Sequence, residues 1–327
     1  MTKSTSESDL LRNALDDSVD LVRRLVSVTD ITTEEVIRRL QKENRELGVN
    51  VREDFDHRGL PRYKWTAEMS DFYNDTNAFL FETIVWNRTL AKHRIREWIG
   101  RFLKQHISGP ARILTFGDGL GFDSLYLALA GHNVEYLEVS QTGIQFATGL
   151  FEDHDVDVKI LTANEQVQSE GYDAVVCLDV LEHIPKPTDV VGDLSAAIRN
   201  QGYLLVHAPF WYIGPSVVTH LRENRRFSGD VRRLYRPHGL HPVDGNWAMN
   251  PMALQKTNTK ESQLGSHFQR LRLAVSRHIL WYGRFWSAPY NIVAAQLTKP
   301  TSWPQLEALQ VSGVRASDLP RSHSHVD

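Results

Sequence analysis

The stretch Ile113-Leu-Thr-Phe-Gly-Asp-Gly-Leu-Gly-Phe-Asp-Ser124 decides the fold. Its first residues favour a β-strand and run into three glycines spaced two apart, Gly117, Gly119 and Gly121, after which Ser124–Ala130 is predicted as a helix. Glycine permits a positive φ and a close approach to bare backbone, and the start of a helix offers unpaired N–H groups. The stretch therefore predicts a strand, a glycine turn and a helix that hold a small polar ligand; a tight turn without a ligand is the alternative.

The composition is that of an ordinary globular protein and narrows the class of partner. The 327 residues are 41% hydrophobic and 24% charged, with a formal net charge of −3 that gives no general reason to expect a polyanion. The single cysteine, Cys177, excludes an internal disulfide framework. The polar N-terminus lacks the apolar core of a signal peptide, and no apolar run approaches the length of about 20 residues that a membrane helix needs. We expect a cytoplasmic protein with no membrane partner.

From the strand before the glycine turn onward, strands and helices alternate along the chain. Strands are predicted at 112–116, 134–139, 158–161, 172–178 and 203–207, and helices at 123–130, 142–151 and 188–199. Alternation at this spacing is typical of βαβ units and of a parallel sheet with helices on both faces. The core is therefore predicted to be a doubly wound, Rossmann-like α/β fold over 106–210.

The flanking regions follow other patterns. Apolar residues at helical spacing predict an N-terminal helical cap over 1–105, with disorder up to about residue 8 and a helix capped by Thr32 or Thr33. The charged segment 51–61, broken by Gly59 and Pro61, is predicted to be a loop.

Downstream of the core, 211–303 is predicted to be a substrate-side insert with the closing strands of the sheet. Its first part, 211–260, is rich in arginine, histidine, glycine and proline and is predicted to be loops with one helix near 217–224. The closing strands are predicted at 270–276 and 290–297, and 304–327 is predicted to be a flexible tail.

The spacing of the glycines and an acidic residue on the next strand narrow the class of ligand that the turn can bind. A dinucleotide fold needs Gly-x-Gly-x-x-Gly, but here the third glycine comes one place early and Phe122 stands where it would be. No Gly-Lys-Ser/Thr follows, which excludes a P-loop. Glu138 ends the next strand, 21 positions after Gly117, where a carboxylate can bind both hydroxyls of a ribose. A solvated acidic residue at a strand end is the alternative.

A third motif follows the strand that begins at Tyr172. The strand emerges at Asp179 and continues as Val-Leu-Glu182-His183-Ile-Pro185. Ligands of open parallel sheets bind outside the carboxyl ends of the strands, so this segment is expected beside the ligand crevice.

At this point the sequence resembles a known family. Ile113–Gly121 resembles the first motif of the class I S-adenosylmethionine-dependent methyltransferases, and Glu138-Val-Ser140 resembles their acidic second motif. Asp173-Ala-Val-Val-Cys-Leu-Asp-Val-Leu-Glu-His-Ile-Pro185 is similar to the fourth-strand motif of the small-molecule branch typified by the ubiquinone-biosynthesis O-methyltransferases. The resemblance covers about residues 110–210 and implies a seven-stranded sheet and S-adenosylmethionine as the cofactor.

The resemblance also implies a role for individual positions. Gly117, Asp118, Gly119 and Gly121 would line the methionine end and the ribose, and Asp179 would face the methionine moiety. Glu138 would hold the ribose hydroxyls, with Val139 against the adenine and Asn164 and Glu165 near its amino group. By analogy, helix 71–86 would fold over the cofactor as a lid, with Tyr73 near the sulfonium.

One position departs from the family pattern. Thr115 stands where the family usually has an acidic residue that fixes the loop and the methionine ammonium. Asp118 is a partial substitute for that residue.

Methyl transfer requires a positioned nucleophile and, for many acceptors, a base. The candidate bases are His183, His207, His238 and His241, of which His183 and His241 are taken as the catalytic candidates; a structural role is the alternative for each. Gly239 and Pro242 argue against a metal site at His238-Gly-Leu-His241, and we expect no metal.

An arginine cluster and several aromatic residues bear on the acceptor. Six arginines within fifteen residues either clamp an anionic acceptor or form a solvated face; they are Arg222, Arg225, Arg226, Arg232, Arg233 and Arg236. Aromatic residues near the expected mouth favour an apolar or planar acceptor.

The sequence therefore predicts a methyltransferase that acts on an oxygen or nitrogen of a small molecule in secondary or cofactor metabolism. The alternatives are an S-adenosylmethionine-binding protein that transfers no methyl group, and an enzyme that methylates RNA or protein. Nucleic acid is not expected as a partner, and the sequence does not predict the oligomeric state.

Overall fold

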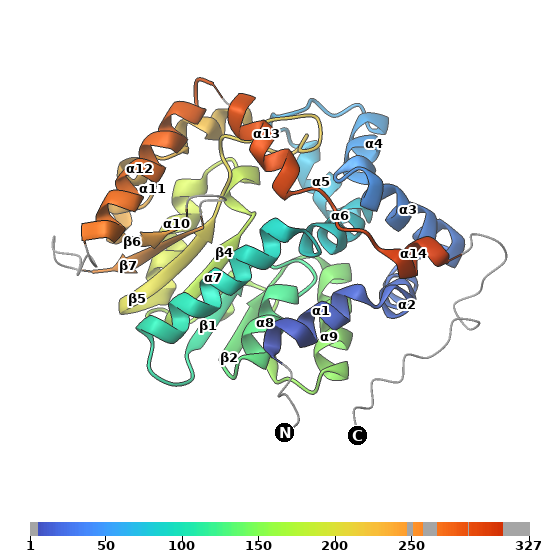
Figure 1. Ribbon diagram of the computed structural model, residues 1–327, viewed down its shortest axis with the longest axis horizontal. Helices are drawn as coiled ribbons and strands as arrows, with labels where there is room; N and C mark the ends of the chain where they lie inside the picture. Colours follow the sequence, from blue (N-terminus) through green and yellow to red (C-terminus); the bar gives the residue numbers. More distant parts are fainter. Residues whose placement is uncertain (1–5, 247–250, 258–266, 287, 310–327) are drawn as a thin grey trace.

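The computed structural model describes residues 6–246, 251–257, 267–286 and 288–309. Its centre is a twisted sheet with helices on both faces, and a group of N-terminal helices lies beside one edge (Figure 1). The C-terminal helix α14 (Pro304–Ala308) lies beside the N-terminal helix α2 (Ser18–Val28). None of the helices that are described is both long and apolar enough to cross a bilayer.

Within the described residues, seven strands form one sheet in the order β3-β2-β1-β4-β5-β7-β6. β1 to β5 are parallel, and β7 runs antiparallel to both of its neighbours. The strands are β1 (Arg112–Phe116), β2 (Asn133–Leu137), β3 (Val158–Leu161), β4 (Tyr172–Leu178), β5 (Ile198–His207), β6 (Leu240–Gly245) and β7 (Met252–Lys256). The predicted fold class, a doubly wound sheet of seven strands, is confirmed.

Helices cover both faces of the sheet and create two separate cores. The core helices are α8 (Phe122–Leu129), α9 (Gln141–Asp153), α10 (Pro187–Ala197) and α11 (Val231–Leu234). Phe122 and Phe146 of α8 and α9 pack on one face with the N-terminal helices. Val191 of α10 and Leu234 of α11 pack on the opposite face. Burial on both faces explains why β4 reads as a nearly continuous apolar run.

The N-terminal region is helical, as predicted. Its helices are α1 (Glu7–Asp16), α2, α3 (Thr33–Arg45), α4 (Val49–His57), α5 (Glu68–Asp75), α6 (Ala78–Asn87) and α7 (Leu90–His106). Thr32 caps α3, because its side chain accepts a hydrogen bond from the N–H of Glu35. The predicted loop over 51–61 is wrong in its first half: α4 continues to His57 because Val51 and Phe55 are buried on one helix face. Residues 1–5 of the predicted disordered end lie outside the described residues, and Glu7 already begins α1.

The prediction of the closing strands is wrong. The segments 270–276 and 290–297 are helical, within α12 (His267–Gly283) and α13 (Ala288–Leu297), and the sheet is closed by β6 and β7 instead. Leu273 and Leu280, seven residues apart, are buried on one face of α12, which is a helical and not a strand period. The helix expected near 217–224 is a short 3-10 helix at Arg222–Phe227.

The beginning of the predicted tail is part of the folded chain. Leu306 of α14 is buried, and the indole of Trp303 donates a hydrogen bond to the carbonyl of Asp16 at 2.9 Å. The guanidinium of Arg88 lies 3.9 Å from the centre of the Trp303 ring. The C-terminal segment is therefore anchored to the N-terminal helices as far as residue 309, and residues 310–327 lie outside the described part of the chain.

Candidate active site

The glycine turn between β1 and α8 has left-handed backbone at each glycine. The φ angles of Gly117, Gly119 and Gly121 are +69°, +65° and +79°. A Cβ at Gly121 would lie 2.7 Å from the Phe151 ring, so this glycine lets α8 and α9 pack closely. A Cβ at Gly119 would meet only Thr83 of α6, at 3.6 Å. The middle of the turn thus presents backbone to the space beneath α6.

Asp118 fixes the turn onto the start of α8. Its carboxylate accepts hydrogen bonds from the N–H of Asp123 at 3.1 Å and from the N–H and hydroxyl of Ser124 at 2.7 and 2.6 Å. The Thr115 hydroxyl lies 2.7 Å from that of Ser124. Burial, with the nearby charge of Asp123, raises the pKa of Asp118 to about 7. Asp118 and Thr115 therefore both fix the loop through the hydroxyl of Ser124.

Glu138 closes the turn from the tip of β2. It accepts hydrogen bonds from the N–H of Gly119 at 2.9 Å, of Val139 at 2.8 Å and of Ser140 at 3.0 Å. Burial raises the pKa of this carboxyl above its usual value. Val139 is 70% exposed beside it, which is high for a residue of this type.

Asn164 and Glu165 extend this edge of the sheet. They form an exposed 3-10 turn, Asn164–Gln166, after β3, which is the neighbour of β2. The structure therefore brings the residues expected at a ribose and an adenine to one edge of the sheet. A carboxylate, an apolar surface and amide groups along that edge fit the polar and planar parts of a nucleoside.

Asp179 lies directly after β4 and is the centre of a buried charge network. It has a φ of +61°, which is uncommon for a residue with a side chain. Its Oδ2 accepts from the ammonium of Lys92 at 3.0 Å and from the indole of Trp86 at 2.9 Å, and its Oδ1 lies 2.5 Å from Nδ1 of His207. Burial opposes ionisation of Asp179, but Lys92 and His207 outweigh burial and hold its pKa below the ordinary range.

The same network of buried charges extends to Asp123, in the first turn of α8 directly after the glycine turn. Lys92 also pairs with Asp123 at 3.0 Å, and Arg96 pairs with Asp123 at 2.6 Å. Burial lowers the pKa of Lys92, but the two carboxylates outweigh burial and raise it, so the ammonium stays charged. Two cations of α7 thus hold Asp123 of α8 and Asp179 of β4 in fixed positions.

A cavity of about 200 Å³ lies next to Asp179, at the carboxyl ends of β4 and β5. Its walls come from α6, the turn after β4, the segment after β5 and α13. The lining residues include Phe79, Glu82, Thr83, Trp86, Asp179, Glu182, His183, His207, Trp211, Tyr212, His220, Ala294 and Thr298. Thr83 belongs to this wall and to the surroundings of Gly119, so the cavity and the glycine turn adjoin.

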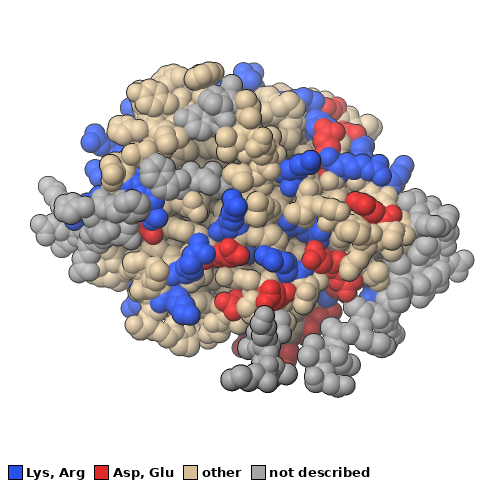
Figure 2. All heavy atoms as spheres, in the orientation of Figure 1, with Lys and Arg blue, Asp and Glu red and all other residues tan. Residues whose placement is uncertain are grey.

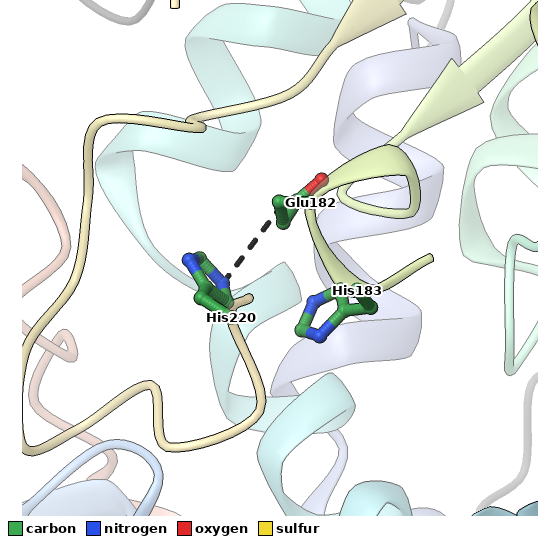
Figure 3. Close-up of side chains that lie close together, drawn as sticks. All are labelled: Glu182, His183 and His220. Carbon is green, nitrogen blue, oxygen red and sulfur yellow. Dashed lines mark ion pairs between the residues drawn. The ribbon is translucent and has the colours of Figure 1, made fainter. Parts of the chain in front are cut away.

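Glu182, His183 and His220 stand together in one wall (Figure 3). Glu182 is 1% exposed, and neither of its carboxylate oxygens has a hydrogen-bond partner among the described residues. Its Oε1 lies 3.9 Å from Nε2 of His220, whose Nδ1 lies 2.7 Å from the carbonyl of Tyr212. Burial raises the pKa of Glu182 well above, and lowers that of His220 well below, the ordinary value. Burial lowers the pKa of His183 to about 4.

These three side chains are also the place where a metal ion would fit. One donor atom from each lies within 4.8 Å of the others, and carboxylate and imidazole are common ligands of divalent transition metals. The sequence prediction considered a metal only at His238 and His241 and expected none. His220 gave no signal, because it is 37 positions from His183 and joins it only through the fold.

His241 lies far from this cavity. It is on β6, opposite Gln255 of β7, which in turn is opposite Tyr203 of β5, and it is not among the residues that line the cavity. His207 is the last residue of β5, at the carboxyl end of that strand, and it lines the cavity. Of the two catalytic candidates, only His183 therefore lines the cavity.

Tyr73 lies on α5 and approaches His183 rather than the glycine turn. Its hydroxyl lies 3.2 Å from Nδ1 of His183, and its ring stacks on Phe79 with the centroids 5.0 Å apart. The residues that approach the turn and Asp179 are Thr83 and Trp86 of α6. The part of segment 71–86 that covers the expected cofactor position is thus α6.

The arginine cluster does not line the cavity: none of its members is among the lining residues. The side chain of Arg225 donates to the carbonyls of Gly283 and Arg284, at 3.2 and 2.6 Å, and so ties two segments together. Figure 2 shows lysine and arginine side chains interspersed with acidic ones on the face in view, without a single continuous basic surface.

Sequence reasoning missed Trp86, Lys92 and Arg96. Lys92 and Arg96 lie on α7, four residues apart, on the face that turns toward the sheet. Two cations on the buried side of an amphipathic helix were a signal for buried acidic partners, but their identity depends on the packing of α7 against β4 and α8.

The comparisons with known proteins agree with this geometry. Residues 87–248 match the model of a family described as a methyltransferase domain. The ubiquinone biosynthesis O-methyltransferase of Hydrogenovibrio crunogenus is 30% identical over 119 residues, which are 35% of this chain and 49% of that protein. That of Rickettsia felis is 30% identical over 122 residues, 35% of this chain and 50% of that protein. This chain therefore spans about half the length of the curated relatives it matches.

Among solved structures, a SAM-dependent methyltransferase from Aquifex aeolicus covers 59% of this chain and 100% of its own, at 13% identity and a TM-score of 0.42. The family match over 87–248 spans β1 to β6, including the glycine turn, Glu138 and Asp179. Residues 87–248 are thus a methyltransferase domain, and the chain's ordered motifs and seven-stranded sheet are similar to those of the class I S-adenosylmethionine-dependent methyltransferases.

Proposed function

We propose that this protein transfers a methyl group from S-adenosylmethionine to an oxygen or nitrogen of a small molecule held in the cavity beside Asp179. The observation that carries the proposal is the position of this cavity. It adjoins the glycine turn through Thr83 and Asp179, so an acceptor in it would face the methionine end of a cofactor on that turn.

Several residues would hold the cofactor. Glu138 would bind the ribose hydroxyls, Val139 would pack on the adenine, and Asn164 and Glu165 would meet its amino group. The half-buried backbone of Gly119 would approach the ribose and methionine. When bound, S-adenosylmethionine supplies an electrophilic methyl group, and the protein aligns the acceptor with it.

The cavity favours a small acceptor that is neutral or cationic. Its volume of about 200 Å³ suits a small molecule, and its aromatic wall suits a planar group. Three acidic side chains line it, and the arginine cluster does not. No lysine or arginine is among the described lining residues to pair with an anion, which is why we propose a neutral or cationic acceptor in place of the anionic one considered from the sequence.

We also propose a division of labour along the chain. The helices within 1–105 form a cap, 106–210 holds the cofactor, and 211–303 shapes the acceptor side. The cavity draws residues from each of these parts: Glu82 from α6, His207 from β5 and Ala294 from α13.

The test is a transfer experiment with S-adenosylmethionine labelled in the methyl group. The protein is incubated with a metabolite extract and, separately, with a panel of phenols, alcohols and amines, and labelled products are identified by mass spectrometry. A labelled small molecule is the expected result. Label on protein or RNA alone, or cofactor binding without any labelled product in either arm, would contradict the proposal and favour the macromolecular or the non-methylating alternative.

A further inference from the structure

His207 has the surroundings of a general base in the acceptor cavity. It is the last residue of β5, is 1% exposed, and contributes to the cavity lining. Its two ring nitrogens have different environments. Nδ1 lies 2.5 Å from Oδ1 of Asp179, whereas the buried Nε2 has no hydrogen-bond partner among the described residues.

The partner of Nδ1 decides where the ring proton sits. Asp179 is held ionised by Lys92, and an ionised carboxylate can only accept hydrogen bonds. Nδ1 of His207 is therefore the donor in this pair. The neutral ring then carries its proton on Nδ1 and leaves the lone pair of Nε2 free.

Several contacts fix the position of Asp179, through both its carboxylate and its backbone. Its Oδ2 is occupied by Lys92 at 3.0 Å and Trp86 at 2.9 Å, which leaves Oδ1 for His207. Its N–H also donates to the carbonyl of His207 at 2.9 Å, and its backbone is in the left-handed region. Unusual backbone of this kind persists where the surroundings determine it, and it clusters at functional sites.

We propose that His207 is the general base of this site, that its Nε2 takes the proton of the acceptor's O–H or N–H, and that Asp179 is the residue that positions it. The inference rests on the proposed function and adds to it a class of acceptor: one that must lose a proton, such as a phenol, an alcohol or an amine. As the acceptor's oxygen or nitrogen bonds to the methyl carbon, its proton passes to Nε2, and the electron pair of the broken carbon–sulfur bond stays on sulfur. Asp179 then faces the imidazolium that results.

Other titratable groups share the cavity and bear on the proton's destination. Those that line it beside His207 are Glu82, Asp179, Glu182, His183 and His220, and Lys92 lies behind Asp179, to which it donates. Nδ1 of His183 is engaged by Tyr73 and Nδ1 of His220 lies beside the Tyr212 carbonyl. Glu182 Oε1 lies 3.9 Å from Nε2 of His220, beyond hydrogen-bond distance, so of these three rings only His207 has a carboxylate hydrogen-bonded to it.

The test reads the ring nitrogens of His207 by NMR. The full-length protein, labelled with ¹⁵N in its histidines and bound to S-adenosylhomocysteine, gives long-range ¹H–¹⁵N correlations that distinguish a protonated from a bare nitrogen. His207→Gln assigns the ring by loss of its signals, and His57→Gln, at an exposed position, is the control. At pH 7 to 8 we expect a protonated Nδ1 and a bare Nε2. A protonated Nε2 throughout this range would overturn the proposal.

Asp179→Asn adds a signature that a purely structural role would not produce. With Lys92 and Trp86 donating to the amide oxygen, the amide NH₂ would face Nδ1 of His207 and move the ring proton to Nε2. An unchanged tautomer in this variant would also overturn the proposal. If the His207→Gln protein does not fold, the shift in Asp179→Asn identifies the ring. Calorimetry of the wild-type protein with S-adenosylhomocysteine is run in parallel, because an absence of binding there would speak against the proposed function and not against the base.

Discussion

The carboxylate of Glu138 accepts a hydrogen bond from the backbone N–H of Gly119 at 2.9 Å. The contact joins the tip of β2 to the middle of the glycine turn, two segments that are 19 residues apart in the chain. It defines the edge at which we propose that the ribose of the cofactor binds.

Replacing Glu138 with alanine tests this assignment. We expect the variant to bind S-adenosylhomocysteine about 1–3 kcal/mol more weakly, or about 5- to 150-fold, because a charged hydrogen-bond partner of the ribose is lost. Calorimetry gives the dissociation constants, and Glu152→Ala, at an exposed position of α9, is the control. An unchanged dissociation constant in a Glu138→Ala protein that melts as a folded domain would show that the ribose binds elsewhere.

Gly121→Ala should destabilise the fold by about 2–4 kcal/mol. The substitution places a side chain at a φ of +79° and brings its Cβ to 2.7 Å from the Phe151 ring, so strain and overpacking add. Gly131→Ala is the matched control: its φ is +83°, but nothing lies within 4 Å of the new Cβ, and it should lose only about 1–2 kcal/mol. Urea denaturation measures both. Equal losses would mean that α8 and α9 do not pack as closely as the structure has them.

Asp118 should make stability depend on pH. Its pKa in the folded protein, about 7, is higher than the ordinary value of 3.8, so the folded state binds more protons between these pH values. The contribution of Asp118 to stability should therefore fall as the pH rises from about 4 to 7 and be constant above that. The free energy of unfolding of the wild type minus that of Asp118→Asn is expected to decline over this window. The same difference for the exposed Asp157→Asn should stay flat, and a difference that rises with pH for Asp118→Asn would contradict the burial of this carboxyl.

Lys92→Met should cost about 3–5 kcal/mol of stability. The methionine fills a similar volume but leaves the buried carboxylate of Asp179 without its ammonium partner and Asp123 with Arg96 alone. Lys104→Met, an exposed substitution on the same helix, should change the unfolding free energy by less than about 0.5 kcal/mol. Matching losses in the two variants would refute the buried network.

The sequence was most informative where local pattern and tertiary role coincide. The glycine turn and the position of Glu138 were predictable because glycine spacing and a strand-end carboxylate have direct structural meaning. The closing strands were not: β6 contains Pro242 and ends at Gly245, and β7 is a short segment, Met252–Lys256, with no alternating pattern. Proline and glycine are both unfavourable in strands, and the pairing of β6 with β7 overrides that preference.

The buried partners of the site were also beyond local reasoning. His220 lies on a loop that the fold brings beside Glu182, and Lys92 forms an ion pair with Asp179, which is 87 residues away in the sequence. Both pairs therefore depend on the packing of distant segments. Thr115 appeared from the sequence to leave the turn without its usual acid. Asp118, three residues later, fixes the start of α8 instead, and Ser124 links the two.

Calorimetric titration of the wild-type protein with S-adenosylhomocysteine tests the central claim most directly. If the glycine turn, Glu138 and the 3-10 turn after β3 form a nucleoside site, one molecule should bind per chain with a saturable heat, and adenosine should compete for it. The absence of any binding heat up to millimolar concentrations, from a protein that melts cooperatively, would contradict the account.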